Sequence, residues 1–99
     1  MNYVDEFIEQ IAHFKEQLNS SIERRIEEGE PAESLSAILQ EYEAAERQFV
    51  SYITEFLMTM QASRMPKRLV MDTVAHYQHK NKHGKRMTEI LNAFIVGDW

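Results

Sequence analysis

Residues 34–60, SLSAILQEYEAAERQFVSYITEFLMTM, decide the fold of this chain. At the ~100° step of an α-helix, the apolar side chains of this stretch fall on an arc of roughly 160°. They are Leu35, Ile38, Leu39, Tyr42, Ala45, Phe49, Tyr52, Ile53, Phe56, Leu57 and Met60. This arc is wider than the seam of a two-stranded coiled coil, so we expect the helix to pack against more than one neighbour. At about 1.5 Å per residue it is roughly 40 Å long and forms the spine of the core.

A second apolar stripe, on residues 3–28, predicts a first helix of similar length. Its members are Val4, Phe7, Ile8, Ile11, Phe14, Leu18, Ile22 and Ile26. The polar triplet at 19–21 could kink this helix, but the stripe continues through it without a change of phase, which favours one continuous helix. Gly29 is a candidate left-handed C-cap, and Pro31 suits the first turn of the next helix, which continues to about Ala62. Because the turn is short, the two long helices should lie antiparallel.

Two shorter helices are expected after this hairpin. The first spans about 66–79 and the second about 85–96, with a polar connector at 80–84 between them. Gly84 is assigned to the connector, where it would tolerate a positive φ. The short helices could lie in series along the hairpin or pair across one end, and the sequence does not choose between these arrangements. The predicted fold class is all-α, a small helical bundle of one domain over residues 1–99. Expected core residues are Phe7, Ile11, Phe14, Leu18, Leu35, Tyr42, Phe49, Ile53, Phe56, Leu91 and Phe94.

Composition excludes several classes of protein. With 43% hydrophobic residues, the chain can bury a core and is too apolar for intrinsic disorder. No apolar run approaches 18 residues and the N-terminus is acidic, so neither a membrane span nor a signal peptide is expected. The lack of cysteine excludes disulfides and thiol catalysis, and we predict a cytoplasmic protein. The chain has no phosphate-binding glycine loop, serine elbow or H-E-x-x-H motif, so we expect neither an enzyme nor a cofactor.

Charge is divided unevenly along the chain, although the net charge is only −5. Residues 1–62 carry four basic and thirteen acidic side chains, whereas residues 63–99 carry seven basic and three acidic ones. Such asymmetry is typical of contact with nucleic acid or an acidic protein. It also fits attraction between the two halves within the fold, which we favour because charge patterning specifies function only weakly.

Four residues form a candidate metal site, spaced by four, three and four positions: Asp72, His76, His79 and His83. On a helix they share one face, and histidines at such spacings can bind zinc, nickel or copper with help from a carboxylate. The same face is expected to be exposed, and neighbouring lysines add repulsive charge. A hydrophilic face without metal is therefore the preferred interpretation, and metal binding is the third of the candidate functions.

The basic segment 64–86 is a candidate nucleic-acid site. Its basic residues are Arg64, Lys67, Arg68, Lys80, Lys82, Lys85 and Arg86. The outline of two helices and a turn suits DNA binding. The connector is long and rich in lysine, however, and the whole-chain pI near 5.3 opposes nonspecific phosphate binding. Nucleic-acid binding is therefore the alternative function.

An acidic cluster surrounds the first turn: Glu23, Glu27, Glu28, Glu30 and Glu33. These carboxylates could mimic phosphates and occupy the nucleic-acid site of a partner. A solvated hairpin tip, in which Arg24 and Arg25 pair locally at i+3 and i+4, accounts for the same residues and is preferred.

The candidate partner-binding surface surrounds the junction of the second and third helices. It comprises Phe56, Leu57, Met58, Met60, Met65 and Met71. Methionine packs adaptably and recurs at protein interfaces. Met58 lies almost opposite the main apolar arc, where a small bundle has difficulty burying it. We weight an interface and ordinary core packing equally here. The predicted function is a non-enzymatic protein–protein interaction module, a small regulator, inhibitor or adaptor of bacterial or phage type that acts on another protein and forms a homodimer.

Overall fold

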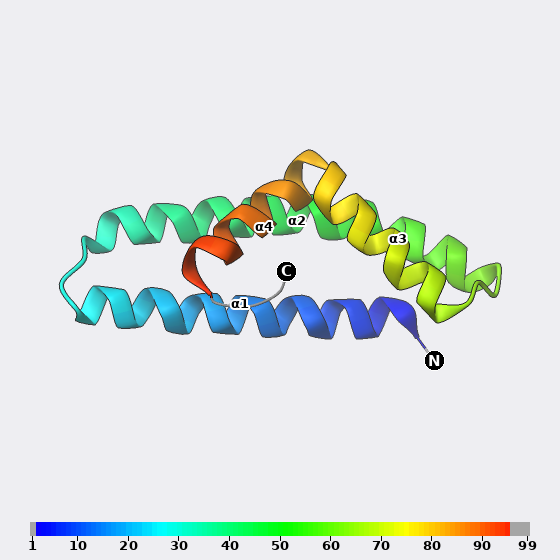
Figure 1. The fold of residues 1–99 in the computed structure, drawn as a ribbon, viewed down its shortest axis with the longest axis horizontal. Helices are drawn as coiled ribbons and strands as arrows, with labels where there is room; N and C mark the ends of the chain where they lie inside the picture. The colour runs from blue at the N-terminus through cyan, green and yellow to red at the C-terminus, as the bar shows by residue number, and fades with distance from the viewer. Residues whose placement is uncertain (1, 96–99) are drawn as a thin grey trace.

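A long antiparallel hairpin is the scaffold of the molecule (Figure 1). In the computed structural model, which describes residues 2–95, α1 spans Tyr3–Glu27 and α2 spans Ala32–Ala62. α3, Lys67–Lys80, and α4, Lys82–Phe94, return along one face of this hairpin. Of the described residues, 88% are helical, and the molecule measures 50 × 21 × 18 Å. The prediction of an all-α helical bundle is confirmed, and α1 is continuous through the polar triplet at 19–21.

Gly29 ends α1 as the sequence predicts. Its φ of +101° lies in the left-handed region, its N–H donates to the carbonyl of Ile26 at 3.0 Å, and the N–H of Glu30 donates to Arg25 at 3.0 Å. This pair of bonds is the Schellman arrangement, which satisfies the last carbonyls of the helix. α2 begins at Ala32, one residue later than expected, because Pro31 has an extended backbone (ψ 118°) and occupies the N-cap.

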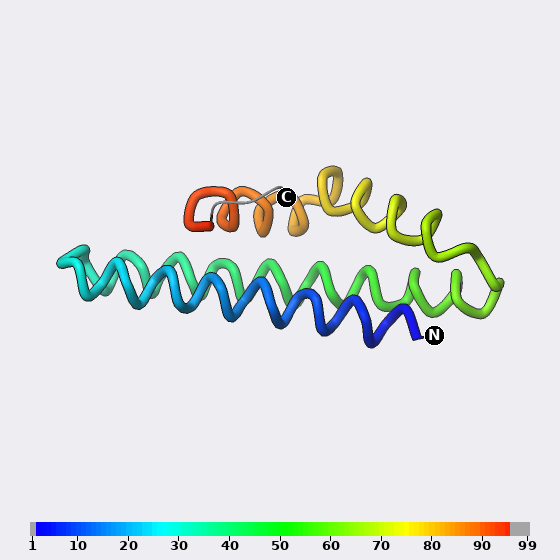
Figure 2. The backbone as a smooth tube through the Cα atoms, turned by 60° about the horizontal axis from the view of Figure 1, so that its bottom comes forward, coloured from blue at the N-terminus to red at the C-terminus, as the bar shows by residue number. Residues whose placement is uncertain are grey.

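α3 and α4 lie in series along the hairpin with a sharp bend between them, as Figures 1 and 2 show. The expected five-residue connector is wrong, because Asn81 alone separates the two helices. Its side-chain oxygen accepts from the N–H groups of His83 (2.9 Å) and Gly84 (3.3 Å), so it caps α4. α4 therefore starts at Lys82, three residues earlier than predicted, and ends at Phe94. The prediction that the helix includes Ile95 is wrong, because Ile95 has an extended backbone, and residue 96 lies outside the described residues.

Gly84 is buried inside α4, and its assignment to a flexible connector is also wrong. A Cβ atom at this position would lie 2.8 Å from the carbonyl oxygen of Gln78 and 2.9 Å from the ring atom Cε1 of Phe49. Only a hydrogen atom fits there, so the missing side chain lets α4 fold back tightly onto the last turn of α3. The glycine is thus required for close approach rather than for a positive φ.

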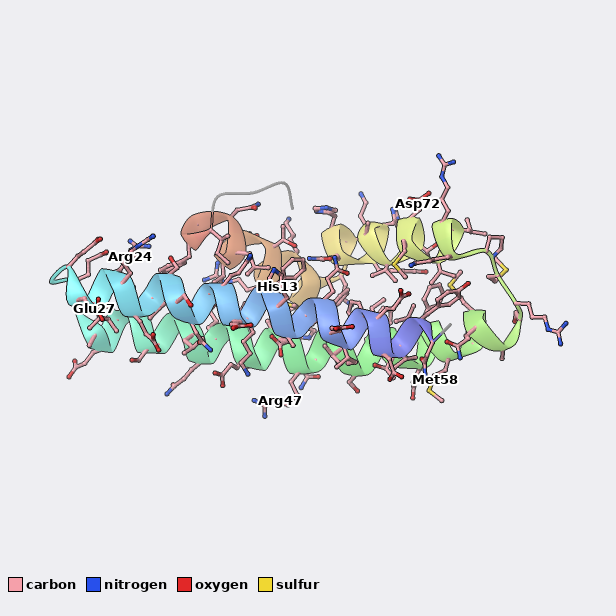
Figure 3. The ribbon with its side chains drawn as sticks, turned by 90° about the horizontal axis from the view of Figure 1, so that it is seen from below. His13, Arg24, Glu27, Arg47, Met58 and Asp72 are labelled. Atoms are coloured by element: carbon pink, nitrogen blue, oxygen red, sulfur yellow. The ribbon has the colours of Figure 1, made fainter. Side chains whose placement is uncertain are left out.

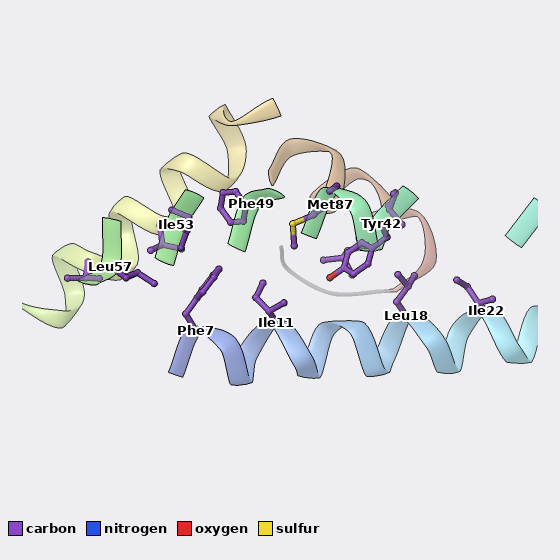
Figure 4. Close-up of a cluster of buried hydrophobic side chains, with 14 of the residues drawn as sticks. Phe7, Ile11, Leu18, Ile22, Tyr42, Phe49, Ile53, Leu57 and Met87 are labelled. Atoms are coloured by element: carbon purple, nitrogen blue, oxygen red, sulfur yellow. The ribbon is translucent and has the colours of Figure 1, made fainter. Parts of the chain in front are cut away.

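The core lies where α1, α2 and the two short helices meet (Figure 4). Phe49 and Phe7 pack edge to face, with ring centroids 6.2 Å apart. Eight of the expected core residues are buried: Phe7, Ile11, Leu18, Leu35, Tyr42, Phe49, Ile53 and Leu91. The other three, Phe14, Phe56 and Phe94, are only partly buried. They lie at the margins of the core because α3 and α4 cover only one face of the hairpin. Tyr52, which belongs to the predicted apolar arc, is 46% exposed.

Candidate interaction surfaces

The predicted methionine surface does not form one exposed patch. Leu57 and Met60 are buried in the core, and the partly buried Phe56, Met65 and Met71 pack against it. Met58 differs from all of these, because its side chain is 59% exposed. It projects from the same side of α2 as Arg47, away from α3 and α4 (Figure 3). Of the six residues, Met58 therefore presents the most accessible apolar side chain to a partner.

An aromatic patch, formed by Tyr52 and Phe56 of α2 with His76 and Tyr77 of α3, lies across the contact between these helices. Tyr77 is its centre, with ring centroids 5.7 Å from Tyr52, 5.3 Å from Phe56 and 5.7 Å from His76, all edge to face. Leu69, which is 46% exposed, precedes His76 by seven residues, or about two turns, and so continues the same side of α3. Sequence periodicity placed Tyr52 inside the core arc and did not reveal this patch.

Two ion pairs join the basic segment to the acidic hairpin. Lys67 Nζ lies 3.0 Å from Glu6 Oε1, and Arg86 Nε lies 2.6 Å from Glu41 Oε1. The hydrogen bond from Arg86 holds the pKa of Glu41 below its usual value. These contacts support internal attraction for part of the charge asymmetry. Within residues 2–95, no ion pair forms at the other five basic residues: Arg64, Arg68, Lys80, Lys82 and Lys85.

The candidate metal ligands are not gathered into a site. The break at Asn81 separates His83 from His76 and His79, and the ring of His76 packs against Tyr77. Asp72 projects outward from α3 (Figure 3). No group of three histidine or acidic side chains within residues 2–95 has the geometry to hold a metal ion.

The acidic hairpin tip is organised by Arg25. Its Nε and NH2 atoms donate to the two carboxylate oxygens of Glu30 at 2.6 and 2.9 Å, across the turn at i+5 rather than at the expected i+3 or i+4. This hydrogen bonding lowers the pKa of Glu30. The guanidinium carbon of Arg25 also lies 4.5 Å from the ring centroid of Phe94, which links the tip to the end of α4.

A groove of about 590 Å³ runs between α1 and α2, and we call it the rear groove because α3 and α4 lie on the other face of the hairpin. Its walls include Ile8, Ala12 and Lys15 of α1 with Glu46, Arg47 and Val50 of α2. Ile8 is 43% exposed, although it belongs to the apolar stripe of α1. An accessible apolar strip therefore lies among charged side chains.

Tyr42 and Glu46 lie one turn apart on α2, and Glu46 lines the rear groove. Tyr42 is fully buried and its hydroxyl points toward α1 (Figure 4). The Tyr42 hydroxyl and Glu46 Oε2 interact electrostatically, but neither forms a hydrogen bond of good geometry within the described residues. Burial raises the pKa of Glu46 and the nearby Glu43 adds to this rise, while Lys15 and Tyr42 oppose it. A partly desolvated carboxylate thus lies in the wall of the groove.

Glu46→Gln should make the isolated chain more stable than wild type at pH 7. The folded-state pKa of Glu46 lies above the ordinary value of 4.5, so the wild-type fold loses stability as pH rises through that folded pKa and the carboxyl ionises. Below about pH 4.5, Glu46 is protonated in both folded and unfolded chains, and the difference from glutamine should disappear. Urea unfolding of both proteins in dilute solution at pH 4 and pH 7 measures this. A less stable glutamine variant at pH 7 would show that the ionised carboxylate stabilises the fold.

Comparison with protein-family models, with curated proteins and with solved structures finds no match for this chain. Among residues 2–95, none of the helices combines the length and the apolar character needed to cross a bilayer. A function therefore has to be inferred from the surfaces themselves.

Proposed function

We propose that the chain is a non-enzymatic protein-interaction module that binds an acidic, partly apolar segment of another protein through the aromatic patch. The observation that carries this proposal is the exposed ring of Tyr52 beside Tyr77, with Leu69 continuing the apolar surface along α3. Aromatic side chains supply much of the binding energy at the centres of protein interfaces, because each buries a large area at a low entropic cost.

The packing of the aromatic rings favours a protein over a nucleic acid. Single-stranded nucleic acids stack their bases on open ring faces. Tyr77 is surrounded by three other rings in edge-to-face contact, so it does not offer a free platform. The net charge of −5 further weakens attraction to phosphates.

The charge around α3 supports an acidic partner. Lys80 follows His76 by one turn and has no ion pair within the described residues, and the same holds for Arg68. Carboxylates on a partner would complement these side chains at the rim of the contact. Such rim charges mainly accelerate association, whereas the buried rings determine the dissociation rate.

Tyr52→Glu should abolish partner binding while leaving the helical content unchanged, since the ring is half exposed. Wild-type protein and variant are immobilised, proteins retained from a nuclease-treated extract are identified, and the retained protein is purified for calorimetric titration. Loss of a central interface tyrosine typically costs about 2 kcal/mol or more, so affinity should fall at least about 30-fold. Increasing salt should slow association more than it speeds dissociation.

Gln40→Glu is the matched control, because it adds one negative charge to an exposed position on the same helix. It should bind the purified partner like wild type. If Tyr52→Glu binds the purified partner as tightly as wild type does, the aromatic patch is not the binding surface. Tight, steeply salt-dependent binding of the purified wild-type chain to DNA or RNA would instead establish the alternative function, which is nucleic-acid binding through the basic side chains that form no ion pair in the described residues.

Homodimer formation and a cytoplasmic location belong to the same proposal. A second copy bound elsewhere on the molecule would present two aromatic patches to a partner. Two linked contacts of this kind raise the overall affinity without any new type of interaction.

A further inference from the structure

We propose that the rear groove is a dimerisation surface that binds the rear groove of a second copy of this chain. This inference deepens the homodimer included in the proposed function and rests on it. It assigns the dimer contact to the face of the hairpin opposite α3 and α4, so the aromatic patch stays accessible to a different protein.

The rear face carries the apolar side chains that such a contact needs. Ile8 of α1 is 43% exposed and Met58 of α2 is 59% exposed. Val50 adds a partly buried side chain between the helices, and the small Ala12 leaves room for another helix to approach. Met58 projects from the same side of α2 as Arg47, so the apolar strip extends beyond the groove itself (Figure 3).

The charges of the groove are balanced, which suits contact between identical surfaces. Two acidic side chains, Glu43 and Glu46, and two basic ones, Lys15 and Arg47, line it. A net charge of −5 opposes self-association of the chain as a whole, but the four charged side chains of this groove sum to zero. A two-fold interface brings a surface against itself, so a charged surface is self-complementary when it carries both signs.

One charged pair in the groove is incomplete within a single copy. Lys15 already pairs with Glu43, at 3.9 Å between Nζ and Oε1. Within residues 2–95, Glu46 Oε2 is buried and interacts electrostatically with Tyr42 but forms no ion pair, while Arg47 is exposed and forms no ion pair either. Neighbouring residues on a helix point about 100° apart, so this arginine and this glutamate do not face each other.

A second copy of the chain would provide the missing ion-pair partners, and two-fold symmetry would form two equivalent ion pairs. In an antiparallel two-fold arrangement of the grooves, Arg47 of each copy reaches Glu46 of the other, while Ile8 and Val50 exclude water around the new ion pairs. The partner copy thereby supplies a direct ion-pair partner for the partly desolvated carboxylate, which has Lys15 as a charged neighbour but forms no ion pair within residues 2–95. The ion pairs of the groove are therefore complete only in the dimer.

Charge exchange between the two positions tests this arrangement by sedimentation velocity over a range of protein concentrations. Wild type should dimerise, and Arg47→Glu should raise the dimer dissociation constant by about 30-fold or more, because it places two carboxylates where one pair should form. Glu46→Lys should weaken dimerisation similarly. An equimolar mixture of the two variants should recover a heterodimer, since each copy then carries the charge that the other requires.

Arg24→Glu is the control, because it makes the same charge change at an exposed arginine outside the groove, and its dimer dissociation constant should match that of wild type. If Glu46→Lys fails to fold by circular dichroism, the exposed Arg47 variant alone still decides the question. A wild-type chain that stays monomeric at every concentration overturns the homodimer and this inference together. A dimer indifferent to Arg47→Glu overturns the groove assignment only. Neither result bears on the aromatic patch, which the Tyr52 variant tests separately.

Discussion

Phe49→Ala should lower the free energy of unfolding by about 3–5 kcal/mol. The Phe49 side chain is fully buried, it packs edge to face against Phe7 of α1, and its Cε1 atom lies 2.9 Å from where a Cβ of Gly84 would be. One ring thus joins α1, α2 and α4. Truncation removes its contacts to all three helices and leaves a cavity that the long, stiff hairpin cannot collapse to fill. Urea unfolding followed by circular dichroism measures the loss.

Tyr52→Ala is the matched control for this experiment, because it removes another aromatic ring from α2 at a half-exposed position. Its cost should be clearly smaller. A loss under about 1 kcal/mol for Phe49→Ala would show that the ring contributes no buried core contact, since full burial of such a side chain is worth more than that.

Gly84→Ala should destabilise the protein by about 1–3 kcal/mol, against the usual trend. In an ordinary helix interior the same change stabilises by about 1 kcal/mol, because alanine is the better helix former. Here the new methyl group would lie 2.8 Å from the Gln78 carbonyl oxygen and 2.9 Å from its Cα, and backbone atoms cannot move aside cheaply. α4 would have to shift away from α3, which should also weaken packing on α2. Thermal and urea unfolding give the sign directly.

The double variant with Phe49→Leu identifies which contact limits the space at this glycine. Shortening the ring removes the close atom of Phe49 but leaves the Gln78 backbone in place. The cost of Gly84→Ala should therefore fall only in part when it is measured in the Phe49→Leu background. If Gly84→Ala costs no stability in the Phe49→Leu background, the steric clash is with the ring of Phe49 alone. If Gly84→Ala stabilises the protein, α3 and α4 do not approach as closely as described.

The periodicity of the sequence predicts the helices well but not the roles of Asn81 and Gly84 at the bend between α3 and α4. Its tolerance of positive φ places Gly84 in the predicted connector, yet Gly84 precedes Met87 by three residues and Leu91 by seven, on their buried face. That spacing is the signal of a packing glycine. Asn81 belongs to the predicted polar connector, although asparagine is a strong N-cap and one such residue can separate two helices.

The surfaces were harder to predict than the core. Glu46 lies three residues before Phe49 and four after Tyr42, so its place within the apolar arc could have marked it as partly buried. For Tyr52 no comparable signal exists, whereas the position of Met58, almost opposite the apolar arc, predicts poor burial, and Met58 is 59% exposed. Periodicity defines the apolar face of a helix, but which edge of that face is covered depends on where α3 and α4 settle, and this is decided by long-range packing.

The short turn at Gly29 also determines the order in which the contacts of the hairpin form during folding. Contacts beside the turn join residues close in sequence, so their loop-closure entropy is small. At the open end, the Tyr3 N–H donates to Gln61 Oε1 at 2.7 Å and its hydroxyl donates to the Met65 carbonyl at 3.0 Å, across about sixty residues. We expect the hairpin to zip from the turn toward these contacts, which form last and open first. The amides around Tyr3 should thus exchange with solvent long before those beside Leu18 and Tyr42.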